Sequence, residues 1–410
     1  MADNRGRIVE SPGLAAAGRS GHAVVPLESG DLIPLPANSR LFLLPGRLAV
    51  GFDAEGRPAS IAGSSAVAAF LPPGYVALCL AAFERERNAA ALPLFTYGAV
   101  CWHRDRFHAP ALRVDSDPKH DPSQFDPRAV AREVRRRLRE QPGNRLLKHH
   151  GEVCALEYGC PNAANLFLGR WEAPVAVSGG CNAACRGCIS EQEDGGIPSP
   201  QARIPFTPTV GEIVELAVPH LERAPRAMVS FGQGCEGEPL LKGRLIETAI
   251  RAIRRRTPRG RLHLNTNGSL PRVLGRLIDA GLNSVRVSLN SAQPSLYSAY
   301  YRCRRYAFQD VRESLRIARQ GGLWVSLNYL TFPGVTDRAD EAGALSRLLA
   351  SARPDMIQWR NLNIDPDAYM ALVDRALPPR RGAGLGVREA IRKVEERFPG
   401  VRMGYFNPPG

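Results

Sequence analysis

Cysteine, lysine and long apolar runs are all scarce in this chain of 410 residues. Nine cysteines are too few for a disulfide scaffold, which excludes the small disulfide-rich class of proteins. No apolar run reaches the ~18 residues of a membrane-spanning helix, because Pro72-Pro73-Gly74 interrupts the best candidate. The first residues include acidic side chains and lack the apolar core of a signal peptide. We therefore expect a cytoplasmic protein without a membrane partner, whose thiols stay free for metals or chemistry.

Lysine supplies only four of the 54 basic residues, and arginine supplies the others. The formal net charge of +14 suits a nucleic-acid partner, whose phosphates attract positive charge. A coding preference for arginine would give the same excess without any ligand. The arginine runs at 135–137 and 254–256 lie in stretches with a helical pattern, where such charges usually face solvent. The charge is therefore compatible with a nucleic-acid partner but does not require one.

The first 150 residues differ in pattern from the rest of the chain. Short apolar runs broken by Gly and Pro fill residues 21–110 and indicate a small β-rich unit. A helix follows, because Asp126 can cap it, Pro127 suits its first turn, and apolar residues recur with helical spacing after them. We expect an N-terminal β-rich domain over 1–150 with this helix at its end, irregular structure over 141–172, and a linker over 151–172.

From residue 174 onward, strand-like runs alternate with helical patterns. The six runs are residues 174–180, 227–233, 261–267, 284–290, 323–330 and 355–363. This alternation predicts parallel βα units, which right-handed crossovers wind into one sheet. Six units are too few for a closed eight-fold barrel, so a partial barrel or an open doubly wound sheet remains. Among the helices, Pro219 should end or kink the one that begins near Val210.

Several of these strands are polar on one face. In the fourth run, aliphatic side chains point to one side, and Arg286, Ser288 and Asn290 point to the other. A parallel sheet covered by helices on both faces would be apolar on both. Antiparallel strands with one wet face would also explain the pattern, but the intervening helices argue against them. We predict an α/β fold: a partial (β/α)6 TIM-like barrel over 173–365 with a polar lumen, and a short C-terminal helical extension over 366–410.

Three cysteines, Cys181, Cys185 and Cys188, follow the first strand with the spacing CxxxCxxC. This loop belongs to the carboxyl end of the sheet, where the active sites of parallel βα folds collect. Structural zinc prefers four ligands, commonly in CxxC pairs, and the sequence has no second CxxC. Three thiolates suit a 4Fe–4S cluster with one iron left free, since such clusters ordinarily take four cysteines. A structural metal site with a distant fourth ligand, or accidental clustering, remains the alternative.

This motif and its place after the first strand resemble the radical SAM (S-adenosylmethionine) superfamily. In that family the free iron holds S-adenosylmethionine, and one-electron reduction cleaves it to methionine and a 5′-deoxyadenosyl radical that abstracts a substrate hydrogen. The resemblance implies a radical SAM enzyme with a 4Fe–4S cluster on the three cysteines and an electron donor such as flavodoxin or ferredoxin. It covers roughly residues 172–365, and it departs from the usual motif at Gly187, where the family often has an aromatic residue.

Further positions match the family's cofactor contacts. Gly237, Glu238 and Pro239 follow the second strand, as the family's glycine-rich motif does, and the resemblance implies that this stretch receives the methionine amino group. Carbonyl groups and a carboxylate suit an ammonium group, and Gly permits a close approach. By the same resemblance, the other expected cofactor contacts are Asn267, Ser288, Asn290 and Asn328.

The remaining cysteines and histidines receive simpler interpretations. Cys235 is interpreted as a small buried residue, with a substrate-facing thiol or radical relay as the alternative. Cys154 and Cys160 are too few to hold an auxiliary cluster without help from Cys79 or Cys101. His149 and His150 are interpreted as a solvent-exposed pair.

The sequence leaves the substrate open. His263 is expected in the lumen as a proton donor or a satisfied interior histidine, and Arg360 and Asn361 as substrate contacts, since arginine suits a carboxylate or phosphate. Three reaction classes remain: modification of a protein or peptide, modification of RNA, and rearrangement of a small molecule. The alternative to an enzyme is a non-catalytic iron–sulfur or zinc module that binds or senses, with affinity for nucleic acid; it needs neither residues 237–239 nor a polar lumen.

Overall fold

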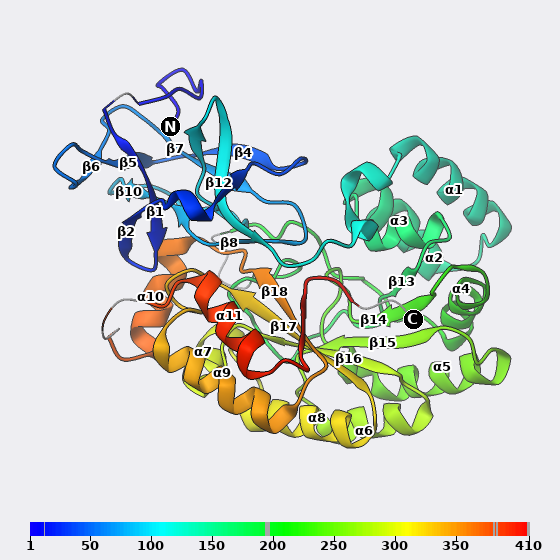
Figure 1. Ribbon diagram of the computed structural model, residues 1–410. Coiled ribbons are helices and arrows are strands. Elements are labelled where there is room, and N and C mark those ends of the chain that lie inside the picture. The colour runs from blue at the N-terminus through cyan, green and yellow to red at the C-terminus, as the bar shows by residue number, and fades with distance from the viewer. Residues whose placement is uncertain (12, 193–196, 380–381, 383, 408–410) are drawn as a thin grey trace.

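The computed structural model (Figure 1) combines a β-rich N-terminal part, a group of helices, and a parallel sheet flanked by helices. It describes residues 1–11, 13–192, 197–379, 382 and 384–407. Within these ranges, no helix is both long enough and apolar enough to cross a membrane. The mixed α/β content agrees with the predicted fold class.

The N-terminal part consists of short strands in antiparallel pairs. They are β1 (Ala15–Ser20), β2 (Ala23–Pro26), β3 (Leu32–Pro34), β4 (Arg40–Leu44), β5 (Arg47–Phe52), β6 (Pro58–Ser60), β7 (Ala66–Phe70), β8 (Tyr75–Ala77), β9 (Leu80–Ala81), β10 (Phe83–Arg85), β11 (Cys101–His103) and β12 (Arg106–Arg113). Three sheets result, with the orders β10-β5-β1-β2, β11-β12-β3 and β4-β7. The expected β-rich character of residues 21–110 is confirmed, whereas the domain boundaries stay a prediction.

Helices connect this part to the parallel sheet. Helix α1 (Pro127–Glu140) begins as expected, with the Asp126 side chain accepting a hydrogen bond from the Arg128 N–H. Helix α2 (Arg145–His149) continues directly into η4 (His150–Glu157), a π-helix, and α3 (Pro161–Phe167) follows. The expectation of irregular structure over 141–172 is therefore wrong, because three helices occupy most of that range. A π-helix has i→i+5 hydrogen bonds, so its apolar residues do not follow the 3.6-residue period by which helices are recognised.

The parallel sheet contains seven strands in chain order. They are β13 (Glu172–Val175), β14 (Met228–Phe231), β15 (Arg261–Thr266), β16 (Ser284–Leu289), β17 (Trp324–Thr331), β18 (Met356–Asn361) and β19 (Arg402–Gly404). All six expected strands are present, and β19, inside the C-terminal extension, was not expected. Strands β13 and β19 each pair with one neighbour, so the sheet is open.

Helices follow most of the strands, and Figure 1 shows α4, α5, α6 and α8 along one side of the sheet. They are α4 (Val210–Arg223), α5 (Gly243–Arg256), α6 (Pro271–Ala280), α7 (Pro294–Tyr301), α8 (Phe308–Gln320), α9 (Ala339–Ala352), α10 (Pro366–Ala376) and α11 (Val387–Arg397). Helix α4 runs through Pro219, so of the two expected effects the end at that residue is wrong, and the kink stays a prediction. One missing N–H late in the helix is tolerated because the apolar face of α4 is buried against the core.

The segment after β19 crosses the polar face of the sheet. Asn407 donates from Nδ2 to Oε1 of Glu172 on the first strand (3.0 Å). Its Oδ1 accepts from Gln358 Nε2 (3.0 Å) and from Arg286 Nη1 (3.4 Å), and its carbonyl accepts from Lys119 Nζ (2.7 Å). The chain itself therefore links the two edges of the open sheet across the face that was predicted to be polar.

A buried ion pair joins the N-terminal strands to the C-terminal helices. Asp365 accepts from Arg47 Nη2 (3.2 Å) and from the Leu92 N–H (2.7 Å), and both charged side chains are 1% exposed. Its other oxygen caps α10 through the N–H groups of Asp367 and Ala368. The Asp365 carboxylate thus connects β5, the segment around Leu92, and the first turn of α10.

Asn361 makes a second connection of this kind. Its Oδ1 accepts from the Ala77 N–H, and its Nδ2 donates to the Tyr75 carbonyl, both at 2.9 Å. Both polar side-chain atoms of Asn361 bond to β8, so its expected contact with substrate stays a prediction. The end of β18 is fastened to the N-terminal part.

Replacement of the buried carboxylate should destabilise the whole chain. We expect Asp365→Ala to lower the free energy of unfolding by about 3–5 kcal/mol, because it leaves the buried Arg47 charge without its acid. Urea unfolding followed by tryptophan fluorescence measures this. The control is Asp374→Ala, which removes an acid that is 55% exposed and pairs with exposed His22, and which should leave the midpoint nearly unchanged. Equal midpoints for the two variants would contradict the assignment.

Candidate functional site

The loop that follows β13 carries the three closely spaced thiols. They belong to Cys181, Cys185 and Cys188, all partly buried and all free. The loop is held against the end of α7 by its backbone: the Ala184 N–H donates to the Tyr301 carbonyl (2.9 Å), and the Arg186 N–H donates to the Tyr300 carbonyl (3.0 Å). Backbone pairing of this kind fixes where the thiols lie without using their side chains.

The three thiols lie close enough to influence one another's ionisation. Burial raises the pKa of Cys181 to about 11, and the charges of Glu238 and Cys188 add to this rise. Burial, together with the charges of Cys188 and Cys181, raises the pKa of Cys185 well above its ordinary value. Three thiolates at this place therefore need positive charge between them, which a metal centre supplies.

Tyrosine side chains form one wall of the cysteine loop. A Cβ atom on Gly187 would lie 2.6 Å from the Tyr300 hydroxyl and 3.0 Å from the Asn363 carbonyl oxygen. The family pattern often has an aromatic residue at position 187, and in this chain Tyr300 fills that space from α7. Tyr297 and Tyr301 stack beside it with ring centroids 4.4 Å apart. The spacing i, i+3, i+4 of these tyrosines could have indicated, from the sequence alone, an aromatic helix face.

The loop after β14 packs directly onto the cysteine loop. The Gly237 N–H donates to the Ser178 carbonyl (2.7 Å), and the Glu238 N–H donates to the Gly180 carbonyl (2.9 Å). A Cβ atom on Gly237 would lie 2.0 Å from the Gly180 carbonyl oxygen and 3.0 Å from the Cys181 nitrogen. Position 237 therefore requires glycine for close approach of two backbones.

Glu238 is buried and joins the second strand to the third. One of its carboxylate oxygens accepts from Thr266 Oγ1 (2.6 Å) and from the Leu240 N–H (2.9 Å), and the other accepts from the Asn267 N–H (2.8 Å). Burial raises its pKa to about 7. Pro239, also buried, begins the short helix η5 (Pro239–Lys242) that Glu238 caps. The predicted motif thus lies at the carboxyl ends of β14 and β15.

Asn267 connects the end of β15 to the cysteine loop. Its Nδ2 donates to Asn182 Oδ1 (2.9 Å), and its Oδ1 accepts from the Ser269 N–H (2.9 Å). Asn182 in turn donates to Ser269 Oγ (2.9 Å). The structure therefore brings Asn267 to the predicted site, where it positions the loop. Asn182, which lies inside the cysteine motif, was missed by the sequence analysis.

The other predicted polar residues lie on and after β16 and β17. Asn328 Nδ2 donates to Ser288 Oγ (3.1 Å), and Asn290 Nδ2 donates to the Tyr369 hydroxyl (3.2 Å). The amide oxygens of Asn290 and Asn328 are buried, and neither accepts a hydrogen bond from any described residue. Buried acceptors are normally paired, so these two oxygens suit a ligand with N–H or O–H groups.

A second buried acid, Glu236, was not identified from the sequence. One carboxylate oxygen accepts from the N–H groups of Gly232 (2.8 Å) and Gln233 (2.7 Å), and the other accepts from those of Val177 (2.7 Å) and Ser178 (3.0 Å). Burial raises its pKa to about 8. It joins the ends of β13 and β14 beneath the site, and its position next to Gly237 was the only signal.

His263 and Arg360 have partners within the protein. His263 pairs through Nδ1 with Ser284 Oγ (2.7 Å) and through Nε2 with Asn265 Oδ1 (3.0 Å), and burial lowers its pKa to about 3. These contacts match the interpretation as a satisfied interior histidine rather than a proton donor. Arg360 donates twice to the Tyr405 carbonyl (3.1 and 2.9 Å), on the segment that follows β19.

A methyl group at position 237 should separate the two loops. We expect Gly237→Ala to lower the free energy of unfolding by about 1–3 kcal/mol through overpacking and to speed the labelling of Cys181 by a thiol reagent. Gly343→Ala is the control, because its Cβ would meet nothing closer than Arg347 Nη1 at 3.5 Å. Urea unfolding and labelling followed by mass spectrometry give both readouts. Wild-type values for Gly237→Ala would show that the loops do not depend on their close contact.

Comparison with known proteins agrees with this geometry. Residues 175–343 match the family model of the Radical SAM superfamily. The GTP 3′,8-cyclase of Streptomyces coelicolor is 29% identical over 187 residues, which are 45% of this chain and 48% of that protein. GTP 3′,8-cyclase 2 of Mycobacterium tuberculosis is 33% identical over 168 residues, 40% of this chain and 43% of that protein. The chain thus spans less than half the length of these curated relatives.

Among solved structures, a radical SAM methyltransferase from Sphaerobacter thermophilus aligns with a TM-score of 0.40 and 21% identity, over 57% of this chain and 66% of that one. The segment matched by the family model contains the cysteine loop, the Gly237 loop, and strands β14 to β17. Residues 175–343 thus match the radical SAM superfamily, whose members work with a 4Fe–4S cluster and S-adenosylmethionine.

Proposed function

We propose that this chain is a radical SAM enzyme that acts on a substrate still to be identified. The observation that carries the proposal is the arrangement of three mutually interacting thiols, with raised pKa values at Cys181 and Cys185, against the glycine contact at position 237. When bound, the 4Fe–4S cluster and S-adenosylmethionine supply reductive cleavage to methionine and a 5′-deoxyadenosyl radical, which abstracts a substrate hydrogen.

The residues present fit this cofactor pair. Cys181, Cys185 and Cys188 would hold the cluster, since a set of three thiolates leaves one iron open. Ser288, Asn290 and Asn328 would contact S-adenosylmethionine, and the two unpaired buried amide oxygens among them are acceptors that such a ligand can use. Backbone carbonyls beside Gly237 and the Glu238 carboxylate would receive the methionine ammonium group.

The protein fixes these groups before any ligand arrives. The Glu238 carboxylate is oriented by three hydrogen bonds from Thr266, Leu240 and Asn267, so it does not need to reorganise to meet a cation. Tyr300 and Tyr301 are buried beside the cysteine loop and would shield one side of a bound cluster from water. Such shielding suits chemistry in which a reactive species must not meet solvent.

In this proposal the six βα units from β13 to β18 form the partial barrel, with the polar face as its interior. The chain order of the strands and the polar residues on that face support it. The substrate would enter from the side of the N-terminal part, which Asn361 and Asp365 fasten to the sheet. The three reaction classes given by the sequence remain the candidates, because the matched relatives share less than half of their length with this chain.

A reducing compartment and an electron donor complete the proposal. All nine cysteines are free, which suits the cytoplasm, where thiols stay reduced. A flavodoxin or ferredoxin would supply the electron. Two of the six arginines in the runs at 135–137 and 254–256 bond within the protein: Arg136 pairs with Glu133 and Glu140, and Arg254 donates to backbone carbonyls of residues 258–260.

Production of 5′-deoxyadenosine tests the reaction without knowledge of the substrate. After anaerobic cluster reconstitution, the chain with S-adenosylmethionine and a strong reductant should release 5′-deoxyadenosine, quantified by chromatography. Cys188→Ala should abolish it, whereas Cys101→Ala should retain it, because Cys101 lies in β11 of the N-terminal part, outside the motif. A spectrum that S-adenosylmethionine leaves unchanged, with no product from a fully loaded cluster, would favour the non-catalytic metal module.

Loss of the buried acid should weaken cofactor binding. We expect Glu238→Gln to raise the Kd for S-adenosylmethionine at least about tenfold, because hydrogen bonds to charged groups contribute about 1.5–3 kcal/mol. Equilibrium binding to the reconstituted chain measures this. Glu247→Gln, on the outer surface of α5, is the matched control. An unchanged Kd for Glu238→Gln would remove this residue from the proposed ammonium site.

A further inference from the structure

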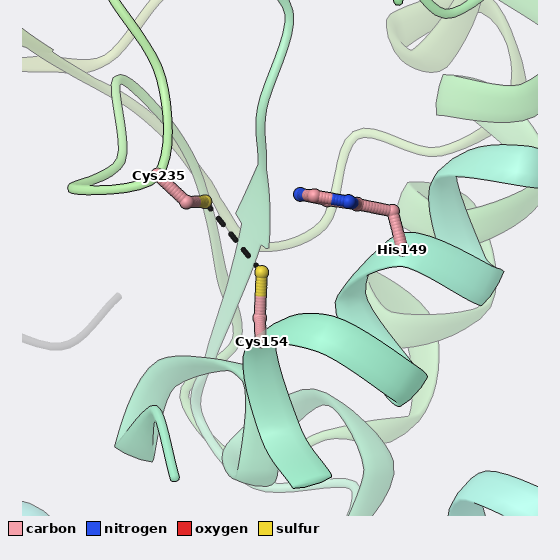
Figure 2. A group of neighbouring side chains, drawn as sticks. All are labelled: His149, Cys154 and Cys235. Atoms are coloured by element: carbon pink, nitrogen blue, oxygen red, sulfur yellow. Dashed lines mark hydrogen bonds between the residues drawn. The ribbon is translucent and has the colours of Figure 1, made fainter. Parts of the chain in front are cut away.

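A second group of metal-binding side chains lies outside the cysteine motif. The potential ligand atoms of His149, Cys154 and Cys235 all lie within 4.8 Å of one another, and all three residues are buried. The sulfur atoms of Cys154 and Cys235 are 3.6 Å apart. Figure 2 shows the imidazole of His149 directed toward these two sulfur atoms.

This group differs from what the sequence led us to expect. His149 and His150 were interpreted as solvent-exposed, but they are 8% and 0% exposed, because the apolar residues around them pack against β13 and α4. Cys154 was considered together with Cys160, yet its neighbour is Cys235, 81 positions further along the chain. The burial expected for Cys235 is confirmed.

The π-helix explains how two of the ligands meet. His149 is the last residue of α2, and Cys154 lies five positions further on, inside η4. In an α-helix, residues five apart are separated by ~140° around the axis. In a π-helix, i→i+5 hydrogen bonds bring such residues above one another. The unusual helix therefore places an imidazole and a thiol on the same face, and π-turns are frequent at functional sites.

The geometry and the unsatisfied nitrogen both suit a metal ion. Two thiolates on one tetrahedral zinc ion, with Zn–S distances of ~2.3 Å, lie ~3.8 Å apart, close to the distance found between Cys154 and Cys235. The Nε2 atom of buried His149 has no hydrogen-bond partner among the described residues. A buried polar atom without a partner is costly, and coordination would satisfy it.

We propose that His149, Cys154 and Cys235 together bind one zinc-type divalent ion, at a second metal site separate from the three-cysteine loop. Two thiolates and an imidazole are the ligands that zinc prefers, and the fourth position is left to a further ligand. Binding would release the two thiol protons and leave both sulfur atoms coordinated to the ion. No redox change is involved.

The position of the site suggests its role. Cys235 lies two residues before Gly237, and its carbonyl accepts from the Ile204 N–H (2.8 Å). An ion held by Cys235 and by the helix formed by α2 and η4 would fasten the loop after β14 to the helical layer. The same loop packs on the cysteine motif through Gly237. The proposed ion is therefore a structural support for one side of the candidate active site.

Cobalt titration tests the site apart from the cluster. The full chain with Cys181→Ser, Cys185→Ser and Cys188→Ser, purified anaerobically and freed of metal, is titrated with Co²⁺ alone. We expect one equivalent to bind, with the intense visible bands of tetrahedral cobalt and near-ultraviolet thiolate-to-cobalt bands. One equivalent of Zn²⁺ should displace it. Because this variant cannot assemble the cluster, the result does not depend on the proposed radical chemistry.

Ligand variants in the same background identify the residues. Cys235→Ser and His149→Ala should each weaken Co²⁺ binding at least about tenfold. Mutation of a residue that only hydrogen-bonds to a metal ligand already lowers metal affinity about 10- to 100-fold. Cys101→Ser, a buried cysteine in β11, should bind as the background does. His149→Cys should restore binding with a stronger thiolate band, which a purely structural role for His149 would not produce.

Three results would overturn the proposal. The first is a background chain that binds no stoichiometric Co²⁺ while its circular dichroism spectrum matches that of the wild type. The second is binding that survives the double variant Cys154→Ala, Cys235→Ala. A disulfide between Cys154 and Cys235 in the anaerobically purified chain, seen by mass spectrometry, would likewise replace the ion with a redox pair.

Discussion

The contact between Gly237 and Gly180 is the constraint on which the rest of the site depends. Two backbones approach so closely that a single Cβ atom at position 237 would lie 2.0 Å from a carbonyl oxygen. Hydrogen bonds from Gly237 to Ser178 and from Glu238 to Gly180 hold the two loops in that position. Because the thiols begin at residue 181, their location relative to β14 and β15 follows from this contact. Glycine is required by the space available rather than by the local backbone angle.

Two buried carboxylates extend this connection to three strands. Glu236 accepts four backbone N–H groups from the ends of β13 and β14, and Glu238 bonds to the end of β15. The N–H groups at the carboxyl ends of parallel strands have lost their sheet partners, and each acid satisfies several of them. Burial raises the pKa of both acids, to about 8 and about 7. The N–H and O–H donors around the two carboxylates offset the free-energy cost of burying them. Hydrogen bonds to buried acids therefore hold the loops of the site in place.

The sequence predicted the features that depend on local pattern. The six strands, the cap at Asp126 and the place of the cysteine motif follow from periodicity and turn chemistry. Prediction from the sequence failed where contacts between residues distant in the chain determine the structure. Strand β19 is short and forms because β18 offers it an edge, the segment around η4 does not follow the helical period, and the partners of Asn361 lie in β8. The roles of Glu236 and Asn182 depend on which loops meet, which one sequence does not specify.

Successive residues of one loop, 232–238, therefore contact three different parts of the molecule. The Cys235 side chain points to the helical layer, the Glu236 carboxylate joins the ends of two strands, and the Gly237 backbone lies on the cysteine loop. Each direction relies on a different interaction: sulfur and imidazole ligands, hydrogen bonds to a carboxylate, and backbone contact. A change at Cys235 would reach the cysteine loop through the covalent chain, since Cys235 lies only two positions before Gly237. The loop after the second strand is thus the mechanical link between the helical layer and the thiols that would hold the cluster.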